Sequence, residues 1–218
     1  MKKNVNIIFP DGTTKIFKSG ITGYEIAFNI SPSLAKQSIL VDVNGKIRDL
    51  SFPIIKDSTI KILKKDSDIA LEIIRHDCAH VMAEAVQELF PGTKITIGPA
   101  IENGFYYDFS RKDAFTNEDL ISIEKKMHEI IEKGEVLVRE VWDRNQALNY
   151  FKKIDEPYKV EIINDFPEDE ELTIYKHSSW LDLCRGPHMP TTGHVGKAFK
   201  LMKIAGAYWR GDEKNEML

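Results

Sequence analysis

The sequence predicts an α+β protein made of two domains, a small strand-rich one and a larger one behind it. Short β-branched runs gather in the first 64 of its 218 residues, and longer stretches with helical spacing follow. A polar joint, Lys64-Lys65-Asp66-Ser67-Asp68, separates these two kinds of sequence. Since 218 residues can bury two modest hydrophobic cores, we expect domains at residues 1–64 and 65–218.

Four β-branched runs predict the strands of the first domain, at residues 4–8, 13–17, 39–43 and 59–63. Turn residues Pro10-Asp11-Gly12 divide the first two runs, and Asn44-Gly45 after the third is a strong hairpin signal. Thr22 can cap a short helix between the second and third runs. The order strand, strand, helix, strand, strand predicts a ubiquitin-like β-grasp. None of its residues is an obvious catalytic group, so we expect a binding or orienting module.

The second domain opens with a predicted helix that runs from the polar joint to about Phe90, where Pro91-Gly92 stops it. Apolar residues recur along it at intervals of three and four and predict its buried stripe: Leu71, Ile74, Cys78, Val81, Ala85 and Leu89. Cys78 is therefore expected in the core. His76 and His80 point away from this stripe, which disfavours their burial in the main core.

Further elements of the second domain follow from the same patterns. Residues 95–109 predict two strands about a Gly/Asn turn, and 116–133 predict an amphipathic helix ended by Gly134. A strand at 136–141, a helix from Asp143 and more strand within 172–183 complete the expected order.

The composition favours a soluble protein and restricts how it would bind nucleic acid. No run of eighteen apolar residues is present, and no uninterrupted apolar stretch of signal-peptide length follows the start, so we expect a cytoplasmic protein with no membrane partner. Residues 1–64 carry ten basic against five acidic side chains, whereas the remainder carries 20 against 29. An acidic second domain is a poor RNA binder by itself, so phosphate contacts are expected from the basic first domain or from another polypeptide.

Two residue pairs with matching spacing, one His-His and one Cys-His, are the candidate chemical centre. His76 and His80 stand one turn apart on the predicted helix, and Cys184 and His188 repeat the three-residue gap near the far end of the domain. Together these four could hold zinc, or could bind and activate water without a metal. The spacing does not choose between the two. Asp77 replaces the glutamate of an HExxH metalloprotease, which disfavours a protease.

Four motifs resemble a known family. HDCAH (76–80) with CRGPH (184–188), together with GPAIENGFYYDF (98–109) and GAYWRGDEKNEML (206–218), is similar to the amino-terminal region of bacterial threonyl-tRNA synthetase. By this resemblance, residues 1–64 are a TGS module and residues 65–218 an editing domain of the threonyl/alanyl-tRNA synthetase type.

The resemblance also implies a function and a set of site residues. The function is proofreading, the hydrolysis of serine wrongly esterified to threonine tRNA while threonyl-tRNA is spared. His76, His80, Lys159, Cys184 and His188 are implied as catalytic, with the four His and Cys residues as candidate metal ligands. The residues implied for substrate binding are Tyr107, Asp182 and Gly98.

In this family the sequence continues into a ligase core that uses ATP, magnesium and zinc, so we expect ligation to be absent from this chain. Editing is expected to need either no cofactor or one zinc ion at the His/His/Cys/His set. The expected partner is threonine tRNA with serine on its 3′ end. We expect this fragment to be monomeric and the full-length enzyme to be a homodimer.

Two rival functions remain open. A free-standing alanyl-type deacylase would share the four residues and would need zinc, but should lack the β-grasp module and the GAYWRG segment. A non-catalytic RNA- or partner-binding fragment would bind without turnover, and the acidic second domain argues against it.

Overall fold

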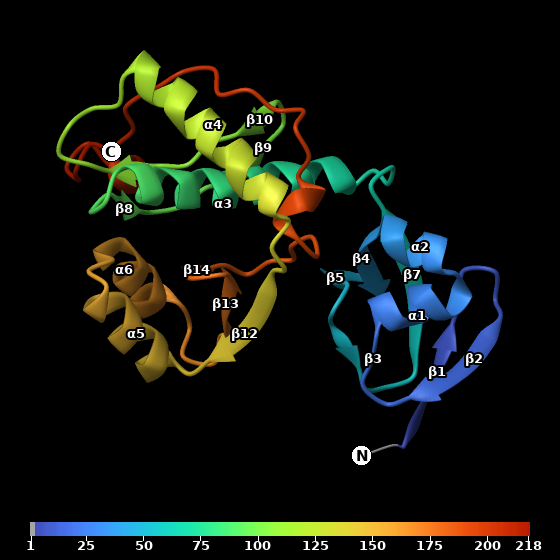
Figure 1. Cartoon of the computed structure of the whole chain (residues 1–218). Helices are drawn as coiled ribbons and strands as arrows, with labels where there is room; N and C mark the ends of the chain where they lie inside the picture. The colour runs from blue at the N-terminus through green and yellow to red at the C-terminus, as the bar shows by residue number, and fades with distance from the viewer. Residues whose placement is uncertain (1–2) are drawn as a thin grey trace. The chain divides into compact units, whose positions relative to one another are not determined.

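The computed structural model describes residues 3–218, which form two compact units (Figure 1). The first unit comprises residues up to Ile74 together with Gly186–Pro190, and the second comprises Arg75–Arg185 and Thr191–Leu218. In the described part of the chain, no helix has both the length and the apolar character that a membrane span requires.

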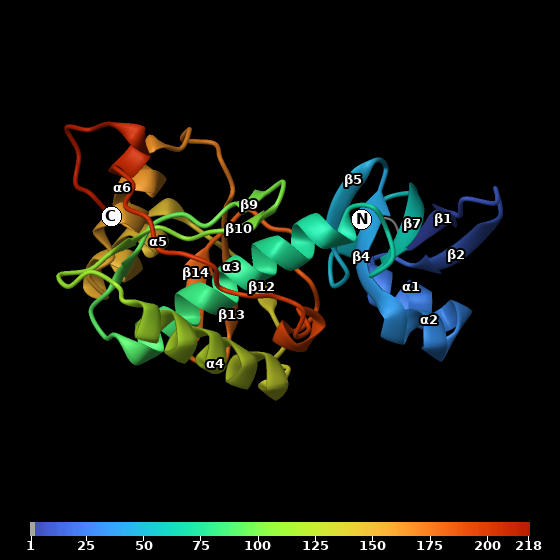
Figure 2. The ribbon, with the colours of Figure 1, turned by 90° about the horizontal axis from the view of Figure 1, so that it is seen from above.

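The first unit is a five-stranded sheet with two helices on one face (Figure 2). The strand order is β2 (Thr14–Lys18), β1 (Asn4–Ile8), β7 (Ser58–Lys64), β4 (Ser38–Val43) and β5 (Lys46–Asp49). The first and last long strands of the unit, β1 and β7, pair in parallel at its centre, while the other neighbours are antiparallel. This is the predicted β-grasp, and all four predicted strands are confirmed.

Side chains of this sheet, of the inner face of α1 (Gly23–Ile30) and of the segment after β5 build an apolar core: Val5, Ile7, Ile26, Val41, Leu50, Ile54 and Ile60. Thr22 caps α1 as predicted, since its hydroxyl accepts the Glu25 backbone N–H and Glu25 returns a bond to the Thr22 N–H. Asn44 and Gly45 take positive φ values of 54° and 80° in the predicted hairpin turn.

Short elements of the first unit were missing from the sequence prediction. They are α2 (Pro32–Gln37), β3 (Ile21–Thr22), β5 and β6 (Pro53–Ile54). Ser31 caps α2 by accepting the Leu34 N–H, and Pro32 occupies the first turn, so this helix does have a local start signal.

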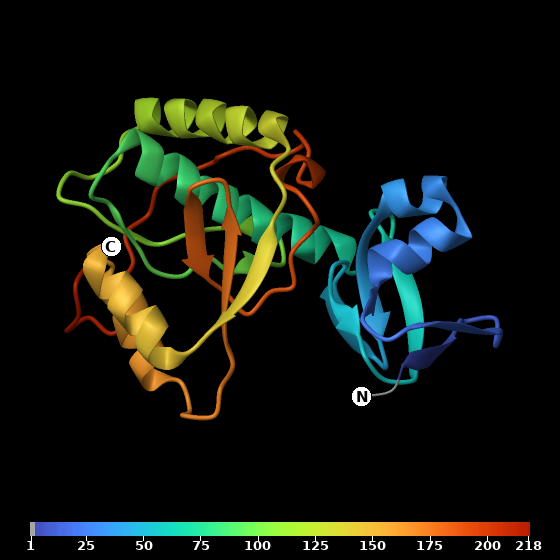
Figure 3. The same cartoon turned by 60° about the horizontal axis from the view of Figure 1, so that its bottom comes forward.

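Two long helices lie side by side in the second unit (Figure 3). They are α3 (Ala70–Leu89), whose first residues belong to the first unit, and α4 (Asn117–Lys133), and a Lys126–Glu88 ion pair of 3.3 Å joins them. Gly134 ends α4 as predicted, in the left-handed conformation at φ 62°, and Thr116, predicted as the first helical residue, is its N-cap.

The second unit also contains a three-stranded antiparallel sheet with two helices packed on it. The sheet order is β12 (Val138–Trp142), β13 (Leu172–His177) and β14 (Trp180–Leu183). The helices α5 (Arg144–Lys153) and α6 (Pro157–Asp165) contribute to a shared apolar core: Ala147, Phe151, Ile163, Leu172 and Ile174.

The region predicted as two strands at 95–109 consists of four two-residue strands. The hairpin β9 (Ala100–Ile101) and β10 (Gly104–Phe105) turns at the expected Gly/Asn position, and β8 (Lys94–Ile95) pairs with β11 (Phe109–Ser110). The two halves of this region pair with each other as predicted, but the pairing is interrupted between the β9–β10 and β8–β11 ladders.

The predicted stripe of α3 is partly wrong. Leu71 is 53% exposed, whereas Asp77, His80 and Glu84 are buried together with Cys78 and Val81. From residue 77 to 86 every side chain of α3 is buried, because the helix runs through the middle of its unit rather than along its surface. The expectation that His80 lies outside the core is therefore corrected, while the core position of Cys78 is confirmed.

Candidate functional site

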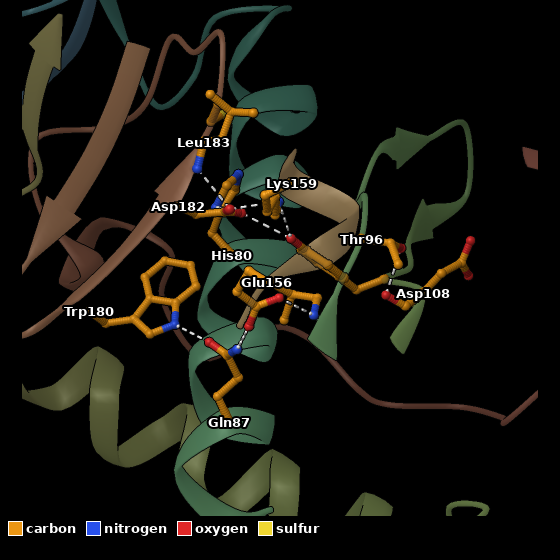
Figure 4. Close-up of polar contacts among 12 residues, drawn as sticks. His80, Gln87, Thr96, Asp108, Glu156, Lys159, Trp180, Asp182 and Leu183 are labelled. Atoms are coloured by element: carbon orange, nitrogen blue, oxygen red, sulfur yellow. Dashed lines mark hydrogen bonds and ion pairs between the residues drawn. The ribbon is translucent and has the colours of Figure 1, made fainter. Parts of the chain in front are cut away.

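Three polar side chains form a closed, buried cluster in the second unit (Figure 4). The Lys159 ammonium lies 2.6 Å from Asp182 Oδ1 and donates to the Tyr107 hydroxyl at 3.1 Å. That hydroxyl donates to Asp182 Oδ2 at 2.9 Å. The side chains of Lys159 and Asp182 are 3% and 1% exposed, so each charge depends on the other for stabilisation.

Each member of this cluster comes from a different element. Lys159 is on the first turn of α6, which Pro157 begins, and Asp182 lies in β14 opposite the buried Tyr175 of β13. Tyr107 lies between β10 and β11. Neither Lys159 nor Asp182 faces solvent, because the two groups are paired inside the unit.

The pKa of the Tyr107 hydroxyl is held well above its usual value, first by burial and then by the negative charge of Asp182. Tyr107 therefore stays protonated and acts in this cluster as a hydrogen-bond donor to the carboxylate.

His80 connects this cluster to the other candidate residues. Its Nδ1 lies 3.5 Å from Asp182 Oδ2, and its ring meets that of His76 edge to face with the centroids 4.8 Å apart. His76 Nε2 in turn lies 3.2 Å from Cys184 Sγ. The fold thus brings together residues that are 108 positions apart in the sequence.

The backbone places Cys184 at the end of the β13–β14 hairpin. Its N–H donates to the Thr173 carbonyl at 3.1 Å, and the Thr173 hydroxyl donates to the Cys184 carbonyl. His76, His80 and Cys184 each present a ligand atom, and these atoms lie within 4.8 Å of one another, which is compatible with holding one metal ion.

His188 belongs to the segment Gly186–Pro190, which is part of the first unit. Its backbone N–H donates to Asp49 Oδ1 at 2.8 Å, and it is buried. Asp49 at the end of β5 therefore fixes the backbone of the predicted fourth residue of the set.

Gly98 lies against the face of Tyr107. A Cβ at position 98 would stand 2.1 Å from a carbon of the Tyr107 ring, which is far inside van der Waals contact. Glycine is thus the residue that lets the tyrosine ring reach Asp182, which gives Gly98 a role in shaping the site rather than a contact group of its own.

A chain of polar contacts beside the cluster was missed by the sequence prediction (Figure 4). Trp180 Nε1 donates to Gln87 Oε1 at 2.9 Å, and Gln87 Nε2 donates to Glu156 Oε1 at 2.6 Å. Glu156 Oε2 accepts the Ile95 N–H at 3.1 Å. Glu156 stands directly before α6, the helix that carries Lys159, and the Trp180 ring meets the His80 ring edge to face. These hydrogen bonds therefore connect the start of α6 to the aromatic ring that packs on His80.

Burial raises the pKa of the Glu156 carboxyl to about 7. No sequence signal marked this residue, since Gln87 and Glu156 are 69 positions apart and neither lies in a motif. The helix α6 was itself not predicted, although Pro157 in its first turn is a start signal, and no local pattern indicates the burial of the Glu156 carboxylate.

Comparison with known families and proteins supports the architecture. Residues 5–64 match the TGS domain, and residues 172–218 match the "Threonyl and Alanyl tRNA synthetase second additional domain". The chain matches the N-terminal region of bacterial threonine–tRNA ligases over its whole length.

Three relatives show how close this match is. The threonine–tRNA ligase of Phenylobacterium zucineum is 54% identical over 98% of this chain and 32% of its own length. That of Rhodospirillum rubrum is 53% identical over 98% of the chain and 33% of its own length. That of Bartonella bacilliformis is 55% identical over all of the chain and 33% of its own length. The chain spans about a third of the length of these relatives. The fold expected from the resemblance, a TGS domain followed by a domain of the editing type, is confirmed.

Proposed function

We propose that this chain hydrolyses the ester that joins serine to threonine tRNA and spares the threonyl ester. The observation that carries the proposal is the group of convergent polar side chains in the second unit. There the His76–Cys184 pair lies next to His80 and the buried Lys159–Asp182 pair. The second additional domain matched by residues 172–218 is named for synthetases of threonine and alanine.

The need for such an activity follows from size. A synthetic site shaped for threonine cannot strongly reject serine, because one methyl group is worth only about 1–3 kcal/mol. A hydrolytic site that admits serine and excludes the extra methyl by overlap removes the error after it is made. Tyr107, packed tightly on Gly98, is a rigid wall suited to such an exclusion.

The reaction adds water to the ester carbonyl and releases the ribose oxygen with a proton. It requires a group that takes a proton from water and donors that stabilise the developing oxyanion. We assign water and the ribose hydroxyls to His76 and His80, since His76 is partly exposed and both rings are adjacent. Cys184, in contact with His76, orients this imidazole.

Lys159 supplies positive charge to the oxyanion or the leaving oxygen. Asp182 was expected to bind the substrate, where a carboxylate suits the ammonium group of the amino acid. Its carboxylate already pairs with Lys159 and accepts hydrogen bonds from Tyr107 and, at 2.7 Å, from the Leu183 backbone N–H. We therefore propose that Asp182 holds Lys159 and Tyr107 in place and balances the ammonium charge through this network.

His188 completes the set in this proposal, on its Asp49-anchored segment. A zinc ion held by His76, His80, Cys184 and His188 would supply a Lewis acid to the same carbonyl, and the 3.2 Å between His76 and Cys184 suits a shared ion as well as a thiol–imidazole hydrogen bond. Loss of hydrolysis in the presence of a chelator would favour the zinc mechanism, and unchanged hydrolysis would favour the metal-free one.

We propose threonine tRNA as the partner, with the basic TGS domain contributing contacts to its phosphates. We also propose that the chain is the proofreading part of a threonine–tRNA ligase, since the relatives that it matches carry that ligase name.

The test is release of serine from seryl-tRNA by the chain and by His76→Ala, Lys159→Met and Cys184→Ser variants, with and without a chelator. We expect His76→Ala and Lys159→Met to lose at least about a hundredfold in rate. His128→Gln is the matched control, because this histidine stacks on Phe199 outside the cluster. Undiminished hydrolysis in His76→Ala and Lys159→Met would overturn the assignment.

A binding module without turnover is the second candidate. It predicts that the chain retains seryl-tRNA without releasing serine at any enzyme concentration, so the same assay decides between them.

A further inference from the structure

Aromatic rings surround the His80 imidazole. The rings of His76, Tyr107 and Trp180 each meet it edge to face, with centroids 4.8, 6.5 and 6.1 Å away. Edge-to-face pairs are favourable at centroid distances of about 4.5–7 Å. His80 Nδ1 and Asp182 Oδ2 are 3.5 Å apart, which is long for a hydrogen bond that fixes the plane of a ring. The contacts with neighbouring rings therefore contribute to the orientation of His80.

Trp180 is the one of these three rings to which the proposed reaction assigns no role. It is the first residue of β14, and it pairs with His177 across the β13–β14 hairpin, where the two rings lie 5.4 Å apart. Both His177 and His80 are buried. The hairpin pairing thus fixes the backbone of Trp180, and the indole ring lies next to two buried imidazoles.

A hydrogen bond from α3 fixes the plane of the indole ring (Figure 4). Trp180 Nε1 donates to Gln87 Oε1 at 2.9 Å. Gln87 lies seven residues after His80 on α3, which places both side chains on the same face of the helix, two turns apart. The same helix therefore contacts the indole twice, at its N–H through Gln87 and at its ring through His80.

The orientation of the Gln87 amide is itself determined by its neighbours. Its Nε2 donates to Glu156 Oε1 at 2.6 Å and to the Thr93 carbonyl at 3.2 Å. A carbonyl oxygen only accepts hydrogen bonds, so the Thr93 contact requires the NH₂ end of the amide and leaves Oε1 for the indole N–H. A methionine at position 87 would be of similar length but could make none of these bonds.

We propose that Trp180 is a positioning residue for His80, with Gln87 setting the plane of its indole ring. The inference rests on the proposed hydrolysis, in which His80 handles water and the ribose hydroxyls. An imidazole that transfers a proton must point its nitrogen at the reacting atom, and a misplacement of about 1 Å can cost about a hundredfold in rate. Because the indole acts through His80, its loss is expected to lower kcat for serine release and to leave KM unchanged.

The first measurement follows the orientation of His80 separately from the rate. The chain has six histidines, so their ring C–H signals in a nuclear magnetic resonance spectrum are few, and His80→Asn identifies that of His80. Gln87→Met leaves every aromatic ring in place, yet it should shift the His80 signal because the indole turns and its ring current acts at a new angle. In a Trp180→Leu background, Gln87→Met should give no further shift. The signals of His128 and His194, whose contacts lie outside this network, should stay in place and show that the variants are folded.

The second measurement is the rate of serine release from seryl-tRNA. Gln87→Met and Trp180→Phe each remove the hydrogen bond between the two residues and keep a ring beside His80. Each should lower kcat about two- to tenfold, the scale expected for one aromatic contact. Since both changes break the same bond, the double variant should be no slower than the slower single variant. Trp180→Leu, which also removes the ring, should be slower than Trp180→Phe.

Trp142→Phe is the matched control. This indole donates to Glu140 at 2.8 Å and meets the Tyr150 ring edge to face, so its loss should leave kcat and the His80 signal unchanged. An unshifted His80 signal in Gln87→Met, or additive losses of kcat in the double variant, would overturn the proposal. A wild-type chain that releases no serine, but in which Gln87→Met shifts the His80 signal, would contradict the proposed function and still support the positioning of His80 by Trp180.

Discussion

The two units bury different kinds of side chain. The interior of the first unit is largely a set of apolar residues, with Asp49 and His188 as its buried titratable groups among the described residues. The second unit buries charged and titratable groups throughout its middle: Asp77, His80, Glu84, Glu156, Lys159, His177 and Asp182.

This difference separates a scaffold from a site. An apolar core is stable with many combinations of side chains, whereas a buried charge is tolerated only with its partner in place. The second unit is therefore less stable than an apolar core of the same size would be, because it holds one fixed arrangement of buried polar groups. Such an arrangement is expected of a chemical centre. Mutations should accordingly have local effects on stability in the first unit and coupled effects on stability and hydrolysis in the second.

The largest effect is expected from Asp182→Ala. This change leaves the Lys159 ammonium buried without its carboxylate, so the second unit should lose about 3–5 kcal/mol of stability together with hydrolysis. Denaturant unfolding measures the loss. Asp165→Ala, an exposed carboxylate paired with Arg210, is the control and should change stability by less than about 1 kcal/mol. Equal stabilities of the two variants would refute the buried pair.

Gly98→Ala should cost less, about 1–3 kcal/mol, because the new methyl group displaces the Tyr107 ring. Hydrolysis should fall with it. A double-mutant cycle with Tyr107→Ala tests the cause, since removing the ring should relieve the cost of the alanine. Additive effects would show that the two positions are independent.

A smaller effect is expected from the titration of Glu156. Its pKa of about 7 in the folded chain lies above the ordinary value of 4.5, so the folded state binds the proton more tightly. The stability that this proton provides is fully present below about pH 4.5 and is lost as the pH rises through 7, at a slope of at most about 1.4 kcal/mol per pH unit. Glu156→Gln should flatten this part of the stability profile, and an unchanged slope between pH 5 and 7 would contradict the burial of this carboxyl.

The smallest effect is expected in the first unit. Thr22→Ala removes the cap of α1 and should cost about 1 kcal/mol without changing the rate of serine release measured per folded molecule. Thr22→Ser, which keeps the hydroxyl, should restore most of the stability. A change in the rate of serine release with Thr22→Ala would contradict the claim that the first unit acts as a scaffold and the second unit carries the site.

The sequence predicted regular elements better than the interior of the second unit. Caps and turns such as Thr22, Asn44-Gly45 and Gly134 act over a few residues, so local patterns identified them. The stripe of α3 was only partly right because it assumed one solvent-facing side along the whole helix, whereas residues 77–86 are buried all round.

The candidate site was predicted partly from spacing and partly from resemblance. The HxxxH and CxxxH pairs are local patterns, but Tyr107, Lys159, Asp182 and Gly98 were identified through the family alone. The burial of Lys159 depends on Asp182, 23 positions away, and that of Glu156 on Gln87. Contacts of this kind arise from packing of distant segments and leave no periodic trace in the sequence.

The most direct test of the central claim is the ratio of serine to threonine released from threonine tRNA by the wild-type chain at high enzyme concentration. The account predicts rapid release of serine with threonine spared. Release of both at equal rates, or of neither in a chain that binds the tRNA, would contradict a hydrolytic site that excludes the threonine methyl group.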